Sequence, residues 1–180
     1  TFWPAGEPGR LLLGNRGASG IDGLVSSGLG AAAGRGEPAA LLLGDLSLYH
    51  DMNGLWAARR NDLRATFVVL DNDGGGIFNF LPPAEHQDVF EELFGTPLGL
   101  RLEDVARLYG LNYCSVEKAE APHPSLRAAL PATASALARV ACSPKVTAQS
   151  APPRPACVSK AVGSDAVHYA QKLDPRLTPS

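Results

Sequence analysis

The chain alternates short apolar runs with segments of helical periodicity, and this alternation constrains its fold more than any other feature. The apolar runs cover residues 11–13, 39–43, 66–70 and 112–116, and the helical patterns cover residues 21–33, 48–60, 89–94 and 102–109. Strands that alternate with helices pair in parallel, and parallel sheets are covered by helices. The sequence therefore predicts an α/β fold, a parallel sheet with helices on both faces.

Composition is that of a globular domain and excludes several kinds of partner. Hydrophobic residues make up 45% of the 180 residues, which is enough for one domain with a core. The net charge of -2 gives no basic field for nucleic acid, and no apolar run approaches the roughly 20 residues that span a membrane. Three widely spaced cysteines, Cys114, Cys142 and Cys157, favour neither a disulfide framework nor a zinc site and agree with a cytoplasmic protein.

The composition changes near residue 141. Residues 143–180 are rich in Pro, Ala, Ser and Lys and contain few large apolar side chains. Such a composition predicts extended or disordered chain. We therefore expect a folded domain over residues 1–141 and an irregular C-terminal tail over residues 142–180.

Three loops rich in Gly and small polar residues follow predicted strands, at residues 14–23, 44–47 and 71–80. Ligands of parallel sheets bind beyond the carboxyl ends of the strands. Gly44-Asp45 directly precedes a helix, whose free N–H groups favour an anion such as phosphate. Because the Asp45 carboxylate would repel that phosphate, we expect a divalent metal such as magnesium between them.

Asn72 ends the next strand, 72 − 45 = 27 residues after Asp45. Since one strand-helix-strand crossover takes about 30 residues, the two loops are expected to be neighbours at one edge of the sheet. An amide oxygen suits a hard cation, and the glycines at 74–76 expose their carbonyls. Either motif alone is more often a helix cap or a turn, whereas the combination at this spacing is more specific.

This combination resembles the thiamine-diphosphate motif, a Gly-Asp followed after a little under 30 residues by Asn. Three stretches, at residues 15–23, 44–53 and 72–82, are similar to the signature of the 2-succinyl-5-enolpyruvyl-6-hydroxy-3-cyclohexene-1-carboxylate synthase family. The similarity covers roughly residues 1–115, and other thiamine-diphosphate enzymes lack the Asn-Arg-Gly-Ala-Ser-Gly-Ile-Asp-Gly stretch. The resemblance implies the thiamine-diphosphate-binding fold, in an incomplete form.

The same resemblance implies which residues hold the cofactor and its metal. Mg²⁺ or Mn²⁺ would be bound by the carboxylate of Asp45, the amide oxygen of Asn72 and the main-chain carbonyl of Gly74. Ser47 is favoured over Ser19 as a cofactor contact, although it could also cap its own helix. The residues implied to bind thiamine diphosphate are Gly44, Asp45, Leu46, Ser47, Asn72, Gly74, Gly75 and Ile77.

Substrate contacts are implied in the same way. Arg16 matches an arginine that contacts the acidic substrates, although an arginine taken alone is more often part of a surface salt bridge. Ile77, Phe78 and Leu81 match residues near the thiazolium and isochorismate, although such residues are more often core. Structural or solvated roles are expected for Asp22, Asp51, Asn53, His50, His86, His123 and His168.

The family's reaction follows from the cofactor. Its members decarboxylate 2-oxoglutarate and add the resulting unit to isochorismate in menaquinone biosynthesis, as cytoplasmic homo-oligomers. The glutamate that activates the cofactor lies on a separate N-terminal domain, and no glutamate here has a similar context, so no catalytic residue is expected. Because the chain also begins at Thr1 rather than Met, we expect a fragment that binds the cofactor weakly and is inactive alone.

Two departures from the family and three alternatives stay open. Asp71 stands where the family usually has a second Asn, and it could add charge near the metal or face away from it. After residue 117 the similarity is weak, Pro131 interrupts an expected late helix, and no closing strand is evident after Ala141. The alternatives are another thiamine-diphosphate enzyme of the acetolactate-synthase kind, a non-catalytic diphosphate-binding module and a degenerate remnant.

Overall fold

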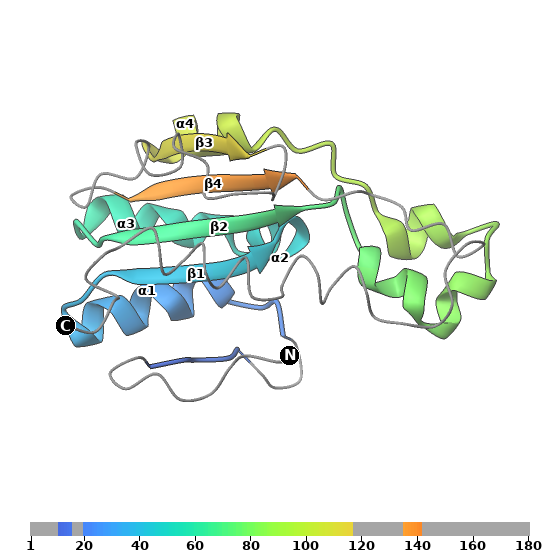
Figure 1. The fold of residues 1–180 in the computed structure, drawn as a ribbon, viewed down its shortest axis with the longest axis horizontal. Helices are drawn as coiled ribbons and strands as arrows, with labels where there is room; N and C mark the ends of the chain where they lie inside the picture. The colour runs from blue at the N-terminus through green and yellow to red at the C-terminus, as the bar shows by residue number, and fades with distance from the viewer. Residues whose placement is uncertain (1–10, 16–19, 117–134, 142–180) are drawn as a thin grey trace.

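The computed structural model describes residues 11–15, 20–116 and 135–141, which contain one four-stranded sheet (Figure 1). Its strands are β1 (Ala39–Gly44), β2 (Ala65–Asp71), β3 (Asn112–Val116) and β4 (Ala136–Ala141). The order across the sheet is β1-β2-β4-β3, and all three pairings are parallel. The prediction of an α/β fold with a parallel sheet is confirmed, and all described strands end at the same edge.

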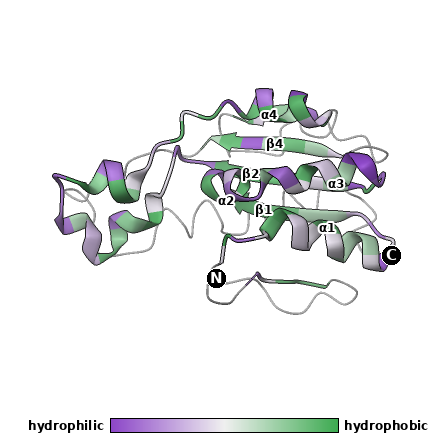
Figure 2. Cartoon of the chain, turned by 180° about the vertical axis from the view of Figure 1, so that it is seen from behind, coloured by the Kyte–Doolittle hydropathy of each residue, from purple (hydrophilic) through white to green (hydrophobic). Residues whose placement is uncertain are grey.

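The helices described lie over one face of this sheet. They are α1 (Leu24–Arg35), α2 (Asp45–His50), α3 (Leu55–Arg60) and α4 (Leu102–Tyr109). Figure 2, which views the sheet from behind, shows these helices in front of the strands. Their buried side chains join those of the strands in a single core cluster. The expected helical cover is therefore present on one face of the sheet within the described residues.

Alternation along the strands builds this core. Leu41 and Leu43 of β1, Phe67 and Val69 of β2, and Leu137 of β4 are all buried in the cluster with the helices. Neighbouring positions point to the opposite face, because successive side chains of a strand alternate. More positions are buried on the central strands β2 and β4 than on the edge strands β1 and β3, as expected of a parallel sheet.

Helix α4 forms over the residues that its periodicity predicts. Its buried residues Leu102, Val105, Ala106 and Tyr109 recur at the spacing of one helical face. Gly110 follows with φ 68, and its N–H donates to the carbonyl oxygens of Ala106 and Arg107, which caps the last turn. The predicted helix end at Gly110 is therefore confirmed.

The helix expected over residues 48–60 is divided into α2, the 3₁₀ turn η1 (Met52–Gly54) and α3. A Cβ atom at Gly54 would lie 2.6 Å from Ser26 Oγ and 3.2 Å from Val25 Cγ1. The chain therefore breaks its helix at the point where it passes close to α1. This approach depends on the missing side chain at Gly54.

Two strand predictions need correction. The strand expected at residues 11–13 is wrong: no strand forms there, and Leu11, Leu12 and Leu13 are 58%, 51% and 68% exposed. A run of three apolar residues is shorter than the four to eight typical of a buried strand. Conversely, β4 was not expected, because Ala and Arg have low strand propensity and Ala136–Ala141 contains four of them.

Residues 73–99 form an arm that projects from the end of β2, with three short turns, η2 (Gly76–Phe80), η3 (Pro82–Glu85) and η4 (Glu91–Gly95) (Figure 1). The helix expected at residues 89–94 is replaced here by the single π-helical turn η4. The rings of Phe78 and Phe94 lie 5.7 Å apart and those of Phe90 and Phe94 6.2 Å apart, which gives the arm a small apolar centre.

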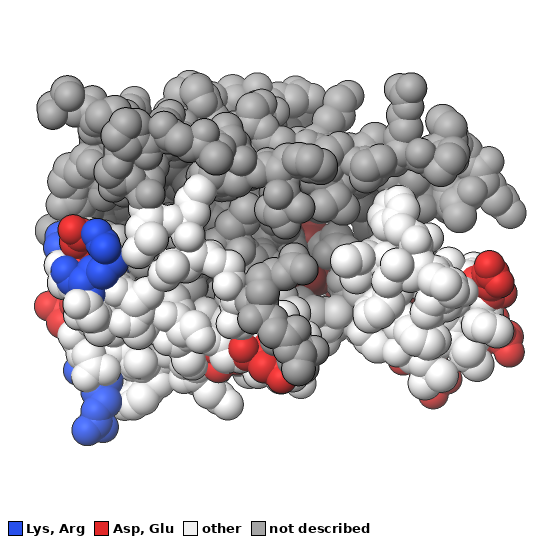
Figure 3. Space-filling view, turned by 90° about the horizontal axis from the view of Figure 1, so that it is seen from below, with Lys and Arg blue, Asp and Glu red and all other residues white. Residues whose placement is uncertain are grey.

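The arm is acidic. Residues 72–100 contain no Lys or Arg, and Glu85, Asp88, Glu91 and Glu92 are all exposed. Figure 3 shows acidic side chains at the outer end of the arm, away from the sheet. None of the helices among the described residues combines the length and the apolar character that a membrane span requires.

The contact between α1 and β1 makes a prediction for two glycines of one helix. A Cβ at Gly28 would lie 2.3 Å from Leu41 Cδ2 and 2.8 Å from Leu41 Cγ, whereas a Cβ at Gly30 would meet nothing within 4 Å. Gly28→Ala should lower the free energy of unfolding by about 1–3 kcal/mol through overpacking. Gly30→Ala should raise it by about 0.5–1 kcal/mol through helix propensity. Urea unfolding measures both, and equal stabilisation by the two variants would contradict this packing.

Candidate functional site

Asp45 is the one buried polar residue among the described residues, with 3% of its surface exposed. It follows β1 directly and is the first residue of α2. Its Oδ2 accepts a hydrogen bond from the Gly74 N–H at 2.7 Å, and its Oδ1 accepts one from the Leu46 N–H at 2.9 Å. Both carboxylate oxygens are thus held in place by backbone donors.

The hydrogen bond from Gly74 shows that the two predicted loops are neighbours. Strands β1 and β2 pair in parallel with Gly44 opposite Leu70, so both chains leave the sheet at the same edge. Asp45 is the residue after β1, and Gly74 comes three residues after the end of β2. The expectation drawn from the 27-residue spacing therefore agrees with the observed positions of the two loops.

A buried carboxylate without a counter-charge is costly. Burial raises the pKa of Asp45, the hydrogen bonds from Gly74 and Leu46 lower it, and repulsion by Asp71 raises it again. Among the described residues, no Lys, Arg or His forms an ion pair with Asp45. A bound cation would supply the missing positive charge, so the residues present fit a metal at this edge of the sheet.

The donor set also restricts which metal fits. The described residues include no group of three or more His, Cys, Asp and Glu side chains that could hold an ion. A cation beside Asp45 would therefore need amide and main-chain oxygens together with oxygens from a ligand. Such an all-oxygen set suits Mg²⁺, which usually binds one or two carboxylates and substrate phosphates.

The glycines after Asn72 are required by close backbone approaches. Gly74 has φ 127, and a Cβ there would lie 2.2 Å from the carbonyl oxygen of Gly95. The Gly75 N–H donates to the same oxygen at 2.7 Å. A Cβ at Gly76 would lie 2.2 Å from Asn72 Nδ2, so the Asn72 side chain packs directly on this loop. The glycine loop at residues 74–76 therefore packs between Asp45 on one side and η4 on the other.

The residues expected to bind the diphosphate gather at the turn from β1 to α2. Gly44 is extended, with φ −83 and ψ 166, and no side chain caps the start of α2. A Cβ at Gly44 would find only ordinary contacts, 3.9 Å from Ser47 Oγ and 4.0 Å from the Leu70 carbonyl oxygen. The protein's own packing therefore leaves space above Gly44, beside Leu46 and Ser47.

The residues expected to contact substrates lie on the arm or outside the described part. Ile77 and Leu81 are 64% and 45% exposed, so they are available to a ligand or to other protein surfaces. Phe78 instead packs against Phe94 within the arm. Arg16 and Ser19 are outside the described residues.

The side chains of Asn15 and Asp51 make structural contacts near the start of α1, and a structural role was expected for Asp51. The Asn15 side chain donates from Nδ2 to the carbonyl oxygen of Asp22 at 2.8 Å. Asp51 Oδ2 accepts from the Ser26 N–H at 2.7 Å and its Oδ1 accepts from Ser26 Oγ at 3.0 Å, which caps the first turn of α1. The start of α1 is thereby fixed to the end of α2.

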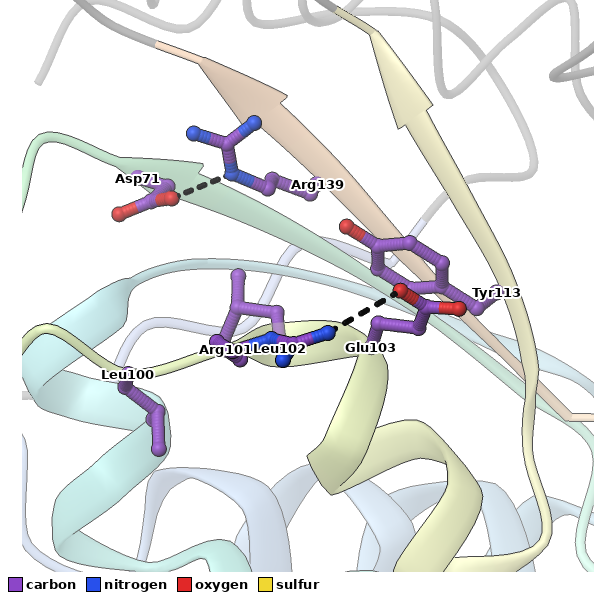
Figure 4. A pocket seen from close by; sticks show the side chains of 7 residues that line it. All are labelled: Asp71, Leu100, Arg101, Leu102, Glu103, Tyr113 and Arg139. Atoms are coloured by element: carbon purple, nitrogen blue, oxygen red, sulfur yellow. Dashed lines mark hydrogen bonds and ion pairs between the residues drawn. The ribbon is translucent and has the colours of Figure 1, made fainter.

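Asp71 faces a residue that sequence analysis missed. Its Oδ2 lies 2.5 Å from Nε of Arg139, which strand β4 contributes (Figure 4). The side chains are 15% and 29% exposed, so the ion pair is partly buried. The signal in the sequence was a lone arginine in the apolar run at Ala136–Ala141, at a strand that was not recognised.

Comparison with known proteins shows which protein family this chain resembles. Residues 1–140 match the family model described as thiamine pyrophosphate enzyme, C-terminal TPP binding domain. The chain is 53% identical over 130 residues to the 2-succinyl-5-enolpyruvyl-6-hydroxy-3-cyclohexene-1-carboxylate synthase of Oceanobacillus iheyensis, and 52% identical over 113 residues to that of Bacillus pumilus. These alignments cover 72% and 63% of this chain but 22% and 20% of the relatives, so the chain spans about a fifth of their length.

A solved structure supports the fold independently. The benzoylformate decarboxylase from Polynucleobacter necessarius superposes with a TM-score of 0.60 at 20% sequence identity. The superposition covers 72% of this chain and 25% of that one. At this identity the likeness establishes a shared fold and nothing about the reaction.

Gly74 and Gly99 both have positive φ, but only Gly74 is in close contact with another part of the backbone. We therefore expect alanine to lower the free energy of unfolding by different amounts at the two positions. Gly99 has φ 55 and open space around a Cβ, so Gly99→Ala should lose about 1–2 kcal/mol from backbone strain alone. Gly74→Ala should lose more, because it adds a collision with the Gly95 carbonyl to the strain. Thermal unfolding compares the two. Equal losses would show that the loop does not pack on η4 as described.

Proposed function

The chain belongs to the thiamine pyrophosphate enzyme family, C-terminal TPP binding domain, and from this we propose that it is the diphosphate- and metal-binding part of a 2-succinyl-5-enolpyruvyl-6-hydroxy-3-cyclohexene-1-carboxylate synthase. The observation that carries the proposal is the hydrogen bond between Gly74 N–H and the buried carboxylate of Asp45. It joins the two loops whose residues would share one cation. Identities of 53% and 52% to synthases of this name support the choice within the larger family.

Three oxygens would hold the cation, either Mg²⁺ or Mn²⁺. They are a carboxylate oxygen of Asp45, the side-chain oxygen of Asn72 and the main-chain carbonyl oxygen of Gly74. The buried charge of Asp45 supports this assignment, because the described residues provide it with no counter-ion. Oxygens of the diphosphate would complete the set, as is usual for Mg²⁺ beside phosphates.

The remaining proposed contacts surround this cation. Gly44, Leu46 and Ser47 would receive the diphosphate where α2 begins, and the absence of a side chain at Gly44 supports a close approach there. Gly75 and Ile77 would border the rest of the cofactor. When bound, thiamine diphosphate supplies the carbanion chemistry of decarboxylation and carbon-carbon bond formation.

The substrates proposed are 2-oxoglutarate and isochorismate, in menaquinone biosynthesis. Arg16 would pair with a substrate carboxylate, which its planar guanidinium suits. Ile77, Phe78 and Leu81 would provide apolar contacts that exclude water, and the exposure of Ile77 and Leu81 leaves them free to do so. The residues of this chain therefore anchor and orient, and no proton transfer is assigned to them.

The whole enzyme is proposed to be a cytoplasmic homo-oligomer in which residues 1–141 form the cofactor-binding unit. The chain alone should turn over little, because it spans about a fifth of the relatives' length. Another thiamine-diphosphate decarboxylase is the alternative. The synthase is favoured because the synthases share more than half of the aligned residues with this chain, whereas the benzoylformate decarboxylase shares 20% and shows the fold alone.

Calorimetry tests the site directly. We expect thiamine diphosphate to bind in the presence of Mg²⁺ and not after chelation, and ATP with Mg²⁺ to bind more weakly. Asp45→Asn should lower the affinity at least about tenfold, since even residues behind the metal ligands change affinity by about 10–100-fold. Its isosteric change removes the charge and leaves the volume unchanged.

Asp62→Asn is the matched control for the charge. Asp62 is exposed beyond α3 and has φ 50, a conformation that asparagine tolerates. This variant should bind thiamine diphosphate as the unaltered chain does. Preference for ATP, or equal binding by the Asp45→Asn variant, would contradict the proposed function.

A further inference from the structure

A second carboxylate, that of Asp71, is next in the chain to the proposed metal ligand Asn72. It forms an ion pair with Arg139 of β4. Asp71 is the last residue of β2 and directly precedes Asn72. Asp45 directly follows β1, which pairs with β2 so that Gly44 lies opposite Leu70. Two carboxylates therefore act at the edge of the sheet where a diphosphate would bind.

Arg139 is held against Asp71 by the geometry of the sheet. In the register of the sheet, Arg139 of β4 is opposite Val69 of β2 and opposite Ser115 of β3. Its side chain extends toward Asp71, where Nε makes the ion pair, while Nη1 donates to Ser115 Oγ at 3.3 Å. The guanidinium is thus held by both Asp71 and Ser115, which a planar, charged group can contact at once.

The charges at this edge explain why such a pair is needed. A diphosphate carries several negative charges, and one divalent cation with Asp45 does not leave the site positive. An additional unpaired carboxylate at Asp71 would repel the diphosphate through a partly buried medium, where charges interact more strongly than in water. Pairing with Arg139 removes most of that repulsion.

We propose that Arg139 is a positioning residue for the cofactor site: it neutralises Asp71, so that Asp45 remains the one uncompensated carboxylate facing the cation. This inference rests on the proposed function of the site. It assigns a role to strand β4 and to the aspartate at position 71.

The Asp71–Arg139 pair borders a cavity. It has a volume of about 240 Å³ and is lined by Asp71, Arg139, Tyr113, Leu100, Arg101, Leu102 and Glu103 (Figure 4). Its charged side chains pair with described neighbours, since Arg101 lies 3.3 Å from Asp104 and 4.0 Å from Glu103. Arg101 therefore shares the cavity with Arg139 without pairing with Asp71.

A double-mutant cycle separates charge compensation from simple stabilisation. The affinity for thiamine diphosphate with Mg²⁺ is measured for Arg139→Gln, Asp71→Asn and the double variant, together with the melting temperature of each. Arg139→Gln should lower the affinity roughly tenfold, because it exposes the charge of Asp71. Asp71→Asn should bind at least as tightly as the unaltered chain, because it removes one negative charge beside the diphosphate.

The double variant decides the proposal. It should recover the affinity of the unaltered chain within about twofold even where its melting temperature stays low, because neither charge remains. If the affinity stays as low as in Arg139→Gln, or if no variant changes it, the inference is overturned. Arg101→Gln is the matched control from the same cavity and should not change the affinity.

Two further outcomes keep the cycle decisive. If Arg139→Gln does not fold, Arg139→Lys replaces it; this variant keeps the charge and should retain the affinity within a few-fold, and a tenfold loss would overturn the inference. If the unaltered chain binds no thiamine diphosphate with Mg²⁺, the proposed function fails along with the inference. If thiamine diphosphate binds normally and the variants of Asp71 and Arg139 do not change its affinity, the inference is overturned while the proposed function stands.

Discussion

The hydrogen bond from the Gly74 N–H to the buried carboxylate of Asp45 is the contact on which the rest of the site depends. Parallel pairing of β1 and β2 brings the two loops to one edge, and this bond fixes their separation. The glycines of the second loop make it possible, because side chains at Gly74 or Gly75 would collide with the backbone of η4. The arm is therefore attached to the sheet at the same point where the cation is proposed.

Asp45 and Asp71, the two aspartates at this edge of the sheet, differ in the groups that contact their carboxylates. Asp71 has a guanidinium partner on β4, whereas Asp45 has backbone donors and no described counter-ion. The proposed cation would supply the charge that this buried carboxylate lacks, whereas Asp71 already has a positively charged partner. This contrast, rather than the presence of acidic residues as such, distinguishes a proposed metal ligand from a structural aspartate.

The sequence predicts the parts of this structure that depend on local pattern. The periodicity of Leu102–Tyr109, the capping Gly110 and the spacing of Asp45 and Asn72 each have a physical cause within a few residues or one crossover. Strand β4 was missed because only its pairing with β2 and β3 makes a run of Ala, Leu, Arg and Val a strand. For the same reason Arg139 and its contact with Asp71 could not be anticipated, since the two are 68 residues apart.

Anomalous diffraction from Mn²⁺ in crystals of the chain grown with thiamine diphosphate would locate the cation itself. We expect one strong peak within about 2.0–2.6 Å of oxygens of Asp45, Asn72 and Gly74. A peak that lies elsewhere on the sheet, or a bound cofactor with no Mn²⁺ beside Asp45, would contradict the proposed cation site.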